Sequence, residues 1–302
     1  MTRYAVADIG TNSVRLMLAD ENCRPVEKRL LTTRIGEKLS ETGGLTEGGM
    51  ARTLNALSGY AKAAHEFGAP LWVFATSAVR DATNKSVFLD RALDAGIPVE
   101  VVSGETEAKL AYLGIGALEK LTLIDIGGGS TEAAKGEGGE LGAAYSAPVG
   151  CVRALERYGS NPSDSELAAL SEWLLDAKVS GGEITMCEAL ASFKPAGRVY
   201  AVSGTATSLA SIFAGVTQEY SASAVHGKVV TKEGILDVLE NLKKLTVEQR
   251  CAIPVLSDRG ELIIHGGVLL LTCMDALGSN DVVVSDSDNL EGYLRYRLNR
   301  GE

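Results

Sequence analysis

The sequence predicts an α/β protein that is built from two related halves. An apolar run ending in Asp-Ile-Gly-x-x-Ser occurs at 4–13 and again at 121–130. Each copy continues with alternating apolar and polar residues, a polar turn and a second alternating run, which is typical of three antiparallel strands. The turns are expected at 20–22 and 136–139. Predicted helices and strands then alternate after each copy, as in α/β units.

The remaining elements follow from hydrophobic periodicity. After the first copy, a helix is expected at 46–67, a strand at 71–76, a helix at 84–95, a strand at 99–103 and a helix at 106–118. After the second copy, helices are expected near 149–158, at 163–178 and at 182–193, then a strand at 198–203 and a helix at 205–214. Amphipathic helices at 232–244 and 261–277 accompany a short strand at 282–285, and a last helix is expected at 289–300.

Length and charge limit the classes of function. The 302 residues correspond to about two domains of ~150 residues each. No apolar run reaches the ~20 residues that span a bilayer, and the first residues enter a strand without a signal peptide, so a cytoplasmic protein without membrane contact is expected. A net charge of −10 argues against a nucleic-acid partner. A polyanionic ligand then requires a local cluster of arginines or backbone N–H groups.

The two Asp-Ile-Gly loops are the strongest candidate for such a site. Glycine lets the backbone approach an anion closely, and successive N–H groups can then face one phosphate. The expected phosphate-binding residues are Gly10, Thr11, Asn12 and Ser13 in the first loop, and Gly127, Gly128, Gly129, Ser130 and Thr131 in the second. The alternative is that Asp-Gly merely forms hairpin turns. The repetition at equivalent places in two halves favours a site.

The carboxylates of these loops suit a metal ion. Asp8 and Asp125 end the two strands. Mg²⁺ prefers oxygen ligands and usually binds through one or two carboxylates, water and substrate phosphate. The sequence therefore predicts Mg²⁺ as the cofactor.

Glu107 is a second candidate, because it follows a strand and a turn at the start of a predicted helix. An acidic residue in a first helical turn is favoured by the helix dipole whatever its function. From the residues alone, Glu107 is therefore either a helix cap or a general base that deprotonates an attacking water.

Four further residues are candidates for phosphate binding. Arg80 follows a strand end rich in small residues and could bind phosphate bidentately, or be an ordinary surface arginine. Arg34 and Arg15 are weaker candidates on the first hairpin. Gly204 opens a predicted helix whose N-terminus could hold phosphate, although helix capping alone would explain the motif.

Taken together, these motifs resemble the exopolyphosphatase/guanosine pentaphosphate phosphohydrolase family. The matching segments are 8–16, 75–84, 103–114, 125–132, 203–210, 225–227 and 266–271. The order of Asp-Ile-Gly-Gly-Gly-Ser-Thr-Glu at 125–132 and Ser-Gly-Thr-Ala-Thr at 203–207 is specific to this family.

The resemblance implies an actin-like ATPase fold, with two similar ribonuclease-H-like domains flanking a cleft. It places the first domain at 1–117, joined by a C-terminal helix at about 288–302, and the second at 118–287. The family's catalytic glutamate falls on Glu107, and its metal-associated acidic positions fall on Asp8, Asp125 and Glu132. The implied reaction is Mg²⁺-dependent hydrolysis of the terminal phosphate of inorganic polyphosphate. Glu132 could instead be an ordinary strand residue.

Two departures from the family pattern affect these expectations. The chain stops at Glu302 without the C-terminal extension of many members, which favours short polyphosphate or a nucleotide-sized substrate. The family's Gly-Leu-Arg-Glu-Gly is Asp-Asn-Leu-Glu-Gly at 288–292, so that Leu290 replaces an arginine. If that arginine serves the cleft or the domain contact, either is expected to be weaker here.

Three alternatives stay open. Guanosine pentaphosphate ends in the same anhydride as polyphosphate, and the sequence does not separate the two substrates. An actin-like small-molecule kinase shares the phosphate loops but needs an adenosine pocket and an acceptor site. A non-enzymatic polyphosphate or alarmone binder would gain nothing from three carboxylates facing a polyanion. The oligomeric state is also open, with a homodimer as one option.

Overall fold

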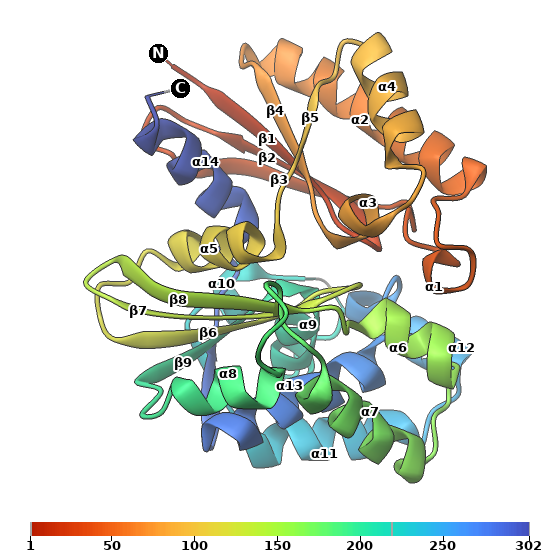
Figure 1. The fold of residues 1–302 in the computed structure, drawn as a ribbon, viewed down its shortest axis with the longest axis vertical. Helices are drawn as coiled ribbons and strands as arrows, with labels where there is room; N and C mark the ends of the chain where they lie inside the picture. Colours follow the sequence, from red (N-terminus) through yellow and green to blue (C-terminus); the bar gives the residue numbers. More distant parts are fainter. Residues whose placement is uncertain (1, 219, 302) are drawn as a thin grey trace. The chain divides into compact units, whose positions relative to one another are not determined.

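The computed structural model describes residues 2–218 and 220–301, which divide into two compact units. The first unit is Met1–Gly114 together with Asn289–Glu302, and the second is Ile115–Asp288. The first unit is therefore made of two segments from opposite ends of the chain, whereas the second is continuous (Figure 1).

The first unit holds one mixed sheet in the order β3-β2-β1-β4-β5. Its strands are β1 (Tyr4–Ile9), β2 (Ser13–Ala19), β3 (Pro25–Thr32), β4 (Leu71–Ala75) and β5 (Val99–Val101). Its helices are α1 (Leu39–Thr42), α2 (Glu47–Phe67), α3 (Ser77–Asp81), α4 (Lys85–Asp94), α5 (Gly104–Ile115) and α14 (Asn289–Asn299). β1 runs antiparallel to β2 and parallel to β4.

The second unit repeats this order as β8-β7-β6-β9-β11 and adds β10 at the far edge. Its strands are β6 (Leu121–Ile126), β7 (Thr131–Glu137), β8 (Glu140–Ala147), β9 (Arg198–Val202), β10 (Lys228–Thr231) and β11 (Asp281–Val284). Its helices are α6 (Cys151–Tyr158), α7 (Asp164–Asp176), α8 (Met186–Ser192), α9 (Ser203–Phe213), α10 (Ala222–Val225), α11 (Lys232–Lys243), α12 (Val247–Cys251), the 3₁₀ turn η1 (Pro254–Leu256) and α13 (Ile263–Leu277). The shared strand order confirms the prediction of two similar α/β units.

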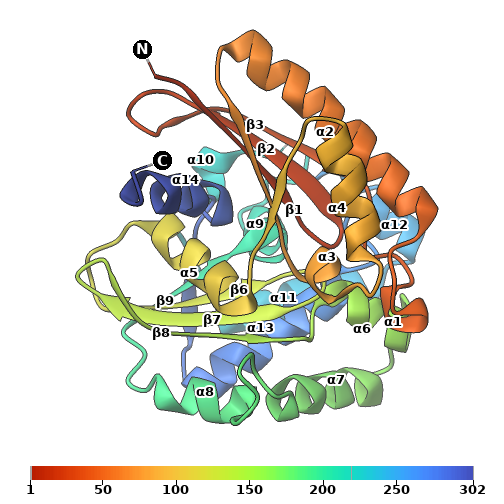
Figure 2. The same ribbon diagram turned by 45° about the horizontal axis from the view of Figure 1, so that its top comes forward.

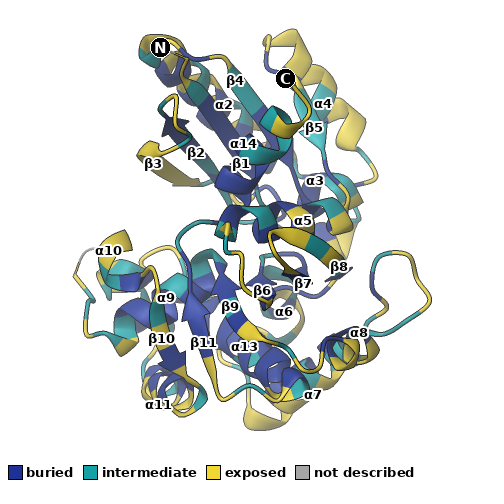
Figure 3. Cartoon of the chain, turned by 90° about the vertical axis from the view of Figure 1, so that its left-hand side faces the viewer, coloured by how far each residue is buried: buried dark blue, intermediate teal, exposed yellow. Residues whose placement is uncertain are grey.

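Pleating assigns the residues of the first sheet to two cores, because successive side chains point to opposite faces. Ala5, Ala7 and Ile9 of β1 pack with α2 and α4. Val6 belongs to a separate cluster that includes Leu110 of α5 and Tyr293 of α14. Asp8 has the same parity as Val6 and therefore lies on the face that α5 and α14 cover. Figure 3 shows β1 as largely buried and β3, at the sheet edge, as exposed.

The C-terminal helix α14 lies directly on α5 (Figure 2). A Cβ added to Gly292 would stand 1.8 Å from the Leu110 carbonyl oxygen, so the two backbones touch and only glycine fits. Leu290, which replaces the family's arginine, is 1% exposed and packs in the same core as Leu110. In this chain the position is therefore a packing site within the first unit.

Several predicted elements differ from the structure. The residues at 77–81, for which no helix or strand was predicted, form the short helix α3, and β10 was not predicted either. The helix predicted at 106–118 starts two residues earlier, at Gly104, because Ser103 caps it. The unit boundaries fall at 114 and 288, against the expected 117 and 287. Among the described residues, no helix is both long and apolar enough to cross a membrane.

Candidate active site

The first Asp-Ile-Gly loop joins β1 to β2 and is closed by a backbone bond from the Gly10 N–H to the Ser13 carbonyl (3.0 Å). The segment after β3 holds the loop carbonyls, because Gly36 donates to Thr11 O at 3.0 Å and Arg34 donates to Asn12 O at 2.8 Å. Across the described residues, the Thr11 and Asn12 amides donate to no backbone carbonyl. Two neighbouring N–H groups without a backbone acceptor are what a loop that binds an anion requires.

The second loop has the same construction. The Gly127 N–H donates to Ser130 O at 2.9 Å, and the segment after β8 holds the loop carbonyls through Cys151 N–H to Gly127 O (3.0 Å). Within the described part of the chain, the Gly128 and Gly129 amides have no backbone acceptor, and the buried Ser130 hydroxyl has no hydrogen-bond partner. A buried hydroxyl without a partner is costly, which favours a ligand at this loop.

A glycine packs against each loop, and the sequence did not single out either one. A Cβ on Gly150 would stand 2.6 Å from the backbone of Gly128 and Ser130. A Cβ on Gly36 would stand 2.3 Å from Thr11 Cγ2. Both glycines follow the third strand of their repeat, so comparing the two halves is the one sequence signal that could have identified them.

The residue that faces the loop aspartate differs between the halves. Asp8 is paired in register with Arg15, whose Nη2 lies 2.5 Å from Asp8 Oδ2. Asp125 is paired in register with Glu132, which is fully buried and accepts a hydrogen bond from Ser146 Oγ at 2.6 Å. Arg15 therefore compensates the charge of Asp8, whereas Asp125 and Glu132 place two carboxylates next to each other.

This carboxylate pair fits a hard divalent cation. Mg²⁺ takes oxygen ligands and commonly keeps several water molecules, so it needs few protein ligands. In the described residues, no cluster of three or more His, Cys, Asp or Glu is placed to hold a metal. Asp125 and Glu132 thus fit a metal that completes its coordination with water and substrate oxygens. Asp8 is less suited, because Arg15 already occupies one of its oxygens.

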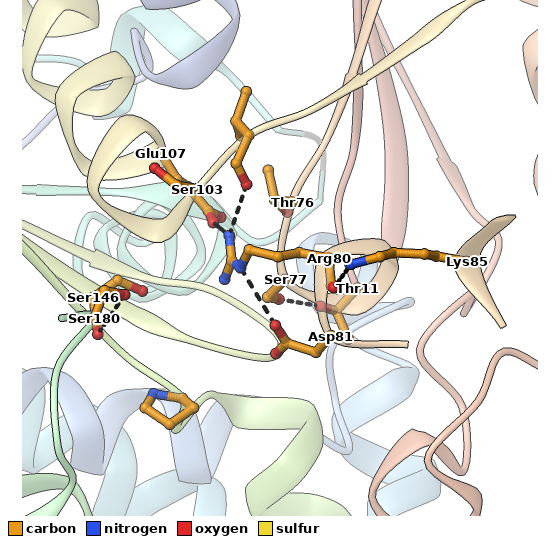
Figure 4. Close-up of polar contacts among 12 residues, drawn as sticks. Thr11, Thr76, Ser77, Arg80, Asp81, Lys85, Ser103, Glu107, Ser146 and Ser180 are labelled. Carbon is orange, nitrogen blue, oxygen red and sulfur yellow. Dashed lines mark hydrogen bonds and ion pairs between the residues drawn. The ribbon is translucent and has the colours of Figure 1, made fainter. Parts of the chain in front are cut away.

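Glu107 lies in the first turn of α5 and is 5% exposed. It does not cap the helix, since Ser103 accepts the Thr106 amide through Oγ (3.1 Å) and the Glu107 amide through its carbonyl (2.8 Å). The Glu107 carboxylate instead binds Arg80 Nη1 at 2.8 Å (Figure 4). The cap alternative is therefore wrong for this side chain.

The surroundings of Glu107 perturb its acidity. Burial raises its pKa to about 7, and Asp8 adds to the increase, while Arg80 and a hydrogen bond from Thr76 oppose it. Arg80 is in turn held by Asp81 (3.4 Å) and the Val102 carbonyl (3.3 Å). A carboxyl poised near neutral pH can take up and release a proton during a reaction, which is the property of a general base.

The remaining predicted phosphate ligands have different surroundings. Arg80 was predicted to bind phosphate, and its guanidinium contacts Glu107 and Asp81. Arg34 adopts a left-handed backbone (φ 50°) where its amide binds Asn12 O. A Cβ on Gly204 would stand 1.9 Å from Arg259 Cζ, so that guanidinium lies on the glycine at the start of α9. Arg259 was not predicted, because nothing in a single sequence links it to Gly204.

Comparison with known proteins identifies the family. Residues 16–300 match the Ppx/GppA phosphatase family. Exopolyphosphatase 2 of Mycobacterium tuberculosis is 30% identical over 318 residues, which covers 97% of each protein. The guanosine-5′-triphosphate,3′-diphosphate pyrophosphatase of Vibrio vulnificus is 32% identical, over 83% of this chain and 52% of that protein.

Solved structures give the same result for the fold. The crystal structure of the Aquifex aeolicus member of the Ppx/GppA family covers 100% of this chain and 99% of its own, with a TM-score of 0.80 and 29% identity. This similarity confirms the predicted fold class over the full length. Together with the sequence matches, it shows that the chain belongs to the Ppx/GppA phosphatase family, as the motif resemblance predicted.

Proposed function

We propose that this protein is a Mg²⁺-dependent exopolyphosphatase that removes the terminal phosphate of inorganic polyphosphate. The observation that carries the proposal is Glu107, a buried carboxylate that is free of any capping role and held by Arg80 on the sheet face that bears Asp8. Family membership supports the reaction class, hydrolysis of a phosphoanhydride.

In the proposed reaction, Glu107 accepts a proton from water while the water oxygen attacks the terminal phosphorus. The bond from that phosphorus to the bridging oxygen breaks, which releases inorganic phosphate and a polyphosphate shortened by one unit. Arg80 orients the Glu107 carboxylate, and the amides at 11–12 and 128–129 bind phosphoryl oxygens. Mg²⁺, which Asp125 and Glu132 would hold, neutralises charge on the substrate oxygens when bound. Arg34 and Gly204 remain proposed contributors to phosphate binding, and Asp8 a proposed contributor to the metal site.

The test is Glu107→Gln, with Glu105→Gln as the matched control. Both residues lie in the first turn of α5, but Glu105 is exposed. Loss of a general base lowers turnover by about 10²–10⁴-fold. We expect that loss for Glu107→Gln, with an unchanged circular dichroism spectrum, and near-normal activity for Glu105→Gln. Retention of most activity by Glu107→Gln would contradict the assignment.

Guanosine pentaphosphate is a second candidate substrate, favoured by the similarity to the Vibrio vulnificus pyrophosphatase. Phosphate release should be measured side by side on tripolyphosphate, long-chain polyphosphate and guanosine pentaphosphate, with and without Mg²⁺. Faster turnover of the nucleotide would replace the proposed substrate. Binding without phosphate release would replace the proposed activity, and transfer to an acceptor would indicate a kinase.

A further inference from the structure

The C-terminal helix α14 makes three kinds of contact with α5, the helix that carries Glu107. Gly292 brings the backbone of α14 against Leu110, one turn beyond Glu107. The Arg295 guanidinium donates to the carbonyls of Leu113 and Gly114, the latter at 3.2 Å. Lys109 Nζ lies 5.4 Å from the centre of the Tyr296 ring. Together these contacts cover α5 from its middle to its C-terminal end.

The Arg295 contact completes the C-terminus of α5. The last carbonyls of a helix have no partner within the helix, and cationic side chains can bind them and interact favourably with the helix dipole. No basic residue lies in the last turn of α5 itself. Arg295 supplies the cation from the opposite end of the chain, so the end of α5 is fixed by a residue of α14.

α14 is itself fastened to the sheet that carries Asp8. Glu291, 3% exposed, forms an ion pair with Lys28 of β3 at 2.6 Å. The Tyr293 ring stacks on Phe74 of β4 with ring centres 4.5 Å apart, and its hydroxyl donates to Glu100 Oε2 at 2.6 Å. The helix is thus anchored to three strands, β3, β4 and β5, and α5 rests on it.

We infer that α14 positions the catalytic base, with Arg295 and Gly292 as positioning residues that set the location of α5 and thereby the 2.8 Å contact between Glu107 and Arg80. The inference rests on the proposed role of Glu107. It assigns the C-terminal helix a part in turnover, although none of its residues is proposed to touch the substrate.

The test uses Arg295→Met in the full-length protein. Methionine keeps an apolar stem but removes the donors to the end of α5. A shift of about 1 Å in a catalytic group can cost up to about 100-fold in rate, so we expect kcat to fall by about tenfold with KM unchanged. Arg295→Lys should recover part of the loss, because an ammonium can still bind one carbonyl. Arg300→Met is the matched control, since Arg300 donates to Tyr296 one turn back in α14 (3.2 Å).

A double-mutant cycle separates positioning from a general effect on folding. If Arg295 acts through Glu107, Arg295→Met should cause no further loss of the residual rate in a Glu107→Gln background. An equal loss in both backgrounds would overturn the inference, as would unchanged kcat in Arg295→Met. An active Glu107→Gln would instead refute the proposed function. Gly292→Ala, which must separate the two helices, should reduce kcat at least as much wherever the variant folds.

Discussion

The two Asp-Ile-Gly loops share their backbone and differ in charge. Each is closed by the same glycine-to-serine bond, and each is held by the segment that follows the third strand of its repeat. Across the neighbouring strand, however, Asp8 faces Arg15 whereas Asp125 faces Glu132. One framework thus carries a neutralised carboxylate in the first unit and an acidic pair in the second. We propose that the repeated backbone binds phosphate in both halves, and that the exchange of arginine for glutamate places the metal at the second loop.

Among the variants that compare the two loops, those that remove the acidic pair have the largest expected effect. Asp125→Asn and Glu132→Gln each take one negative charge and one ligand from the proposed metal site. We expect the Mg²⁺ concentration for half-maximal phosphate release to rise by at least about 10–100-fold, the range known even for residues that only support metal ligands. Ser146→Ala, which removes the bond to Glu132, should cause a smaller increase. An unchanged Mg²⁺ dependence in both carboxylate variants would place the metal elsewhere.

The glycines that support the loops should differ in their tolerance of a methyl group. In Gly150→Ala the new Cβ meets the backbone of Gly128 and Ser130, which cannot move without changing the loop. In Gly36→Ala its closest contact is the end of the Thr11 side chain. Since displacement of binding groups by about 1 Å can cost about 100-fold, we expect kcat/KM to fall by that order in Gly150→Ala and much less in Gly36→Ala. Equal losses would show that the two loops are supported alike.

Arg15→Met tests the first loop, in which Arg15 neutralises Asp8. The substitution leaves the buried Asp8 carboxylate without its arginine partner. Breaking a buried pair costs about 3–5 kcal/mol, and the 23% exposure of Arg15 reduces that figure, so we expect the free energy of unfolding to fall by about 2 kcal/mol. Urea denaturation would measure it. Arg29→Met, which removes an exposed ion pair with Glu27 on the next strand, is the control and should change stability by less than about 1 kcal/mol.

The smallest expected effect is the pH dependence of kcat/KM that follows from the raised pKa of Glu107 in the first unit. Its pKa of about 7 means that the base is increasingly protonated below neutral pH. We expect kcat/KM to fall about tenfold per pH unit below that value. Arg80→Met should move this limb to higher pH, because Arg80 lowers the pKa of Glu107. A flat profile between pH 5.5 and 7, roughly the range in which the acid form accumulates, would argue against Glu107 as the base.

The raised pKa of Glu107 also predicts how the stability of the protein depends on pH. The folded-state pKa lies above the ordinary value of 4.5, so the folded chain binds more protons than the unfolded chain between these values. This contribution to stability is complete below pH 4.5 and is lost as the pH rises to about 7. Glu107→Gln should remove that loss, so its unfolding free energy should gain relative to the wild-type value as the pH rises, with the largest relative gain above pH 7.

The sequence predicted the repeated parts of the molecule well, because repetition and strict alternation are local signals. Both three-stranded runs, and the two loops between their strands, lie where the pattern placed them. The helix that carries Glu107 was also predicted, although the role of its carboxylate required knowing that Ser103 caps the helix. Helix α3 was missed because five residues are too few for periodicity to register.

Contacts between residues that are far apart in the chain could not be predicted from the sequence. Arg80 pairs with Glu107 and Arg259 packs on Gly204 only because the tertiary structure brings them together. In neither pair does the identity of one residue indicate the other. The same holds for Leu290, where a lost arginine suggested a weaker site. The structure shows a buried leucine among Leu110 and Tyr293, a packing role that follows only once α14 is known to return to the first unit.

Because α14 returns to the first unit, the two units are completed in a fixed order during synthesis. A ribosome completes the whole continuous second unit, Ile115–Asp288, before it makes the residues that finish the first. Domains commonly fold as they emerge, so the second unit can be native while α5 still lacks the helix it rests on. The long sequence separation between Leu110 and Gly292 makes their contact a late and slow step. A chain caught at that stage would bear both proposed phosphate loops while Glu107 lacked its support, so we expect hydrolysis only after α14 has been made and has packed on α5.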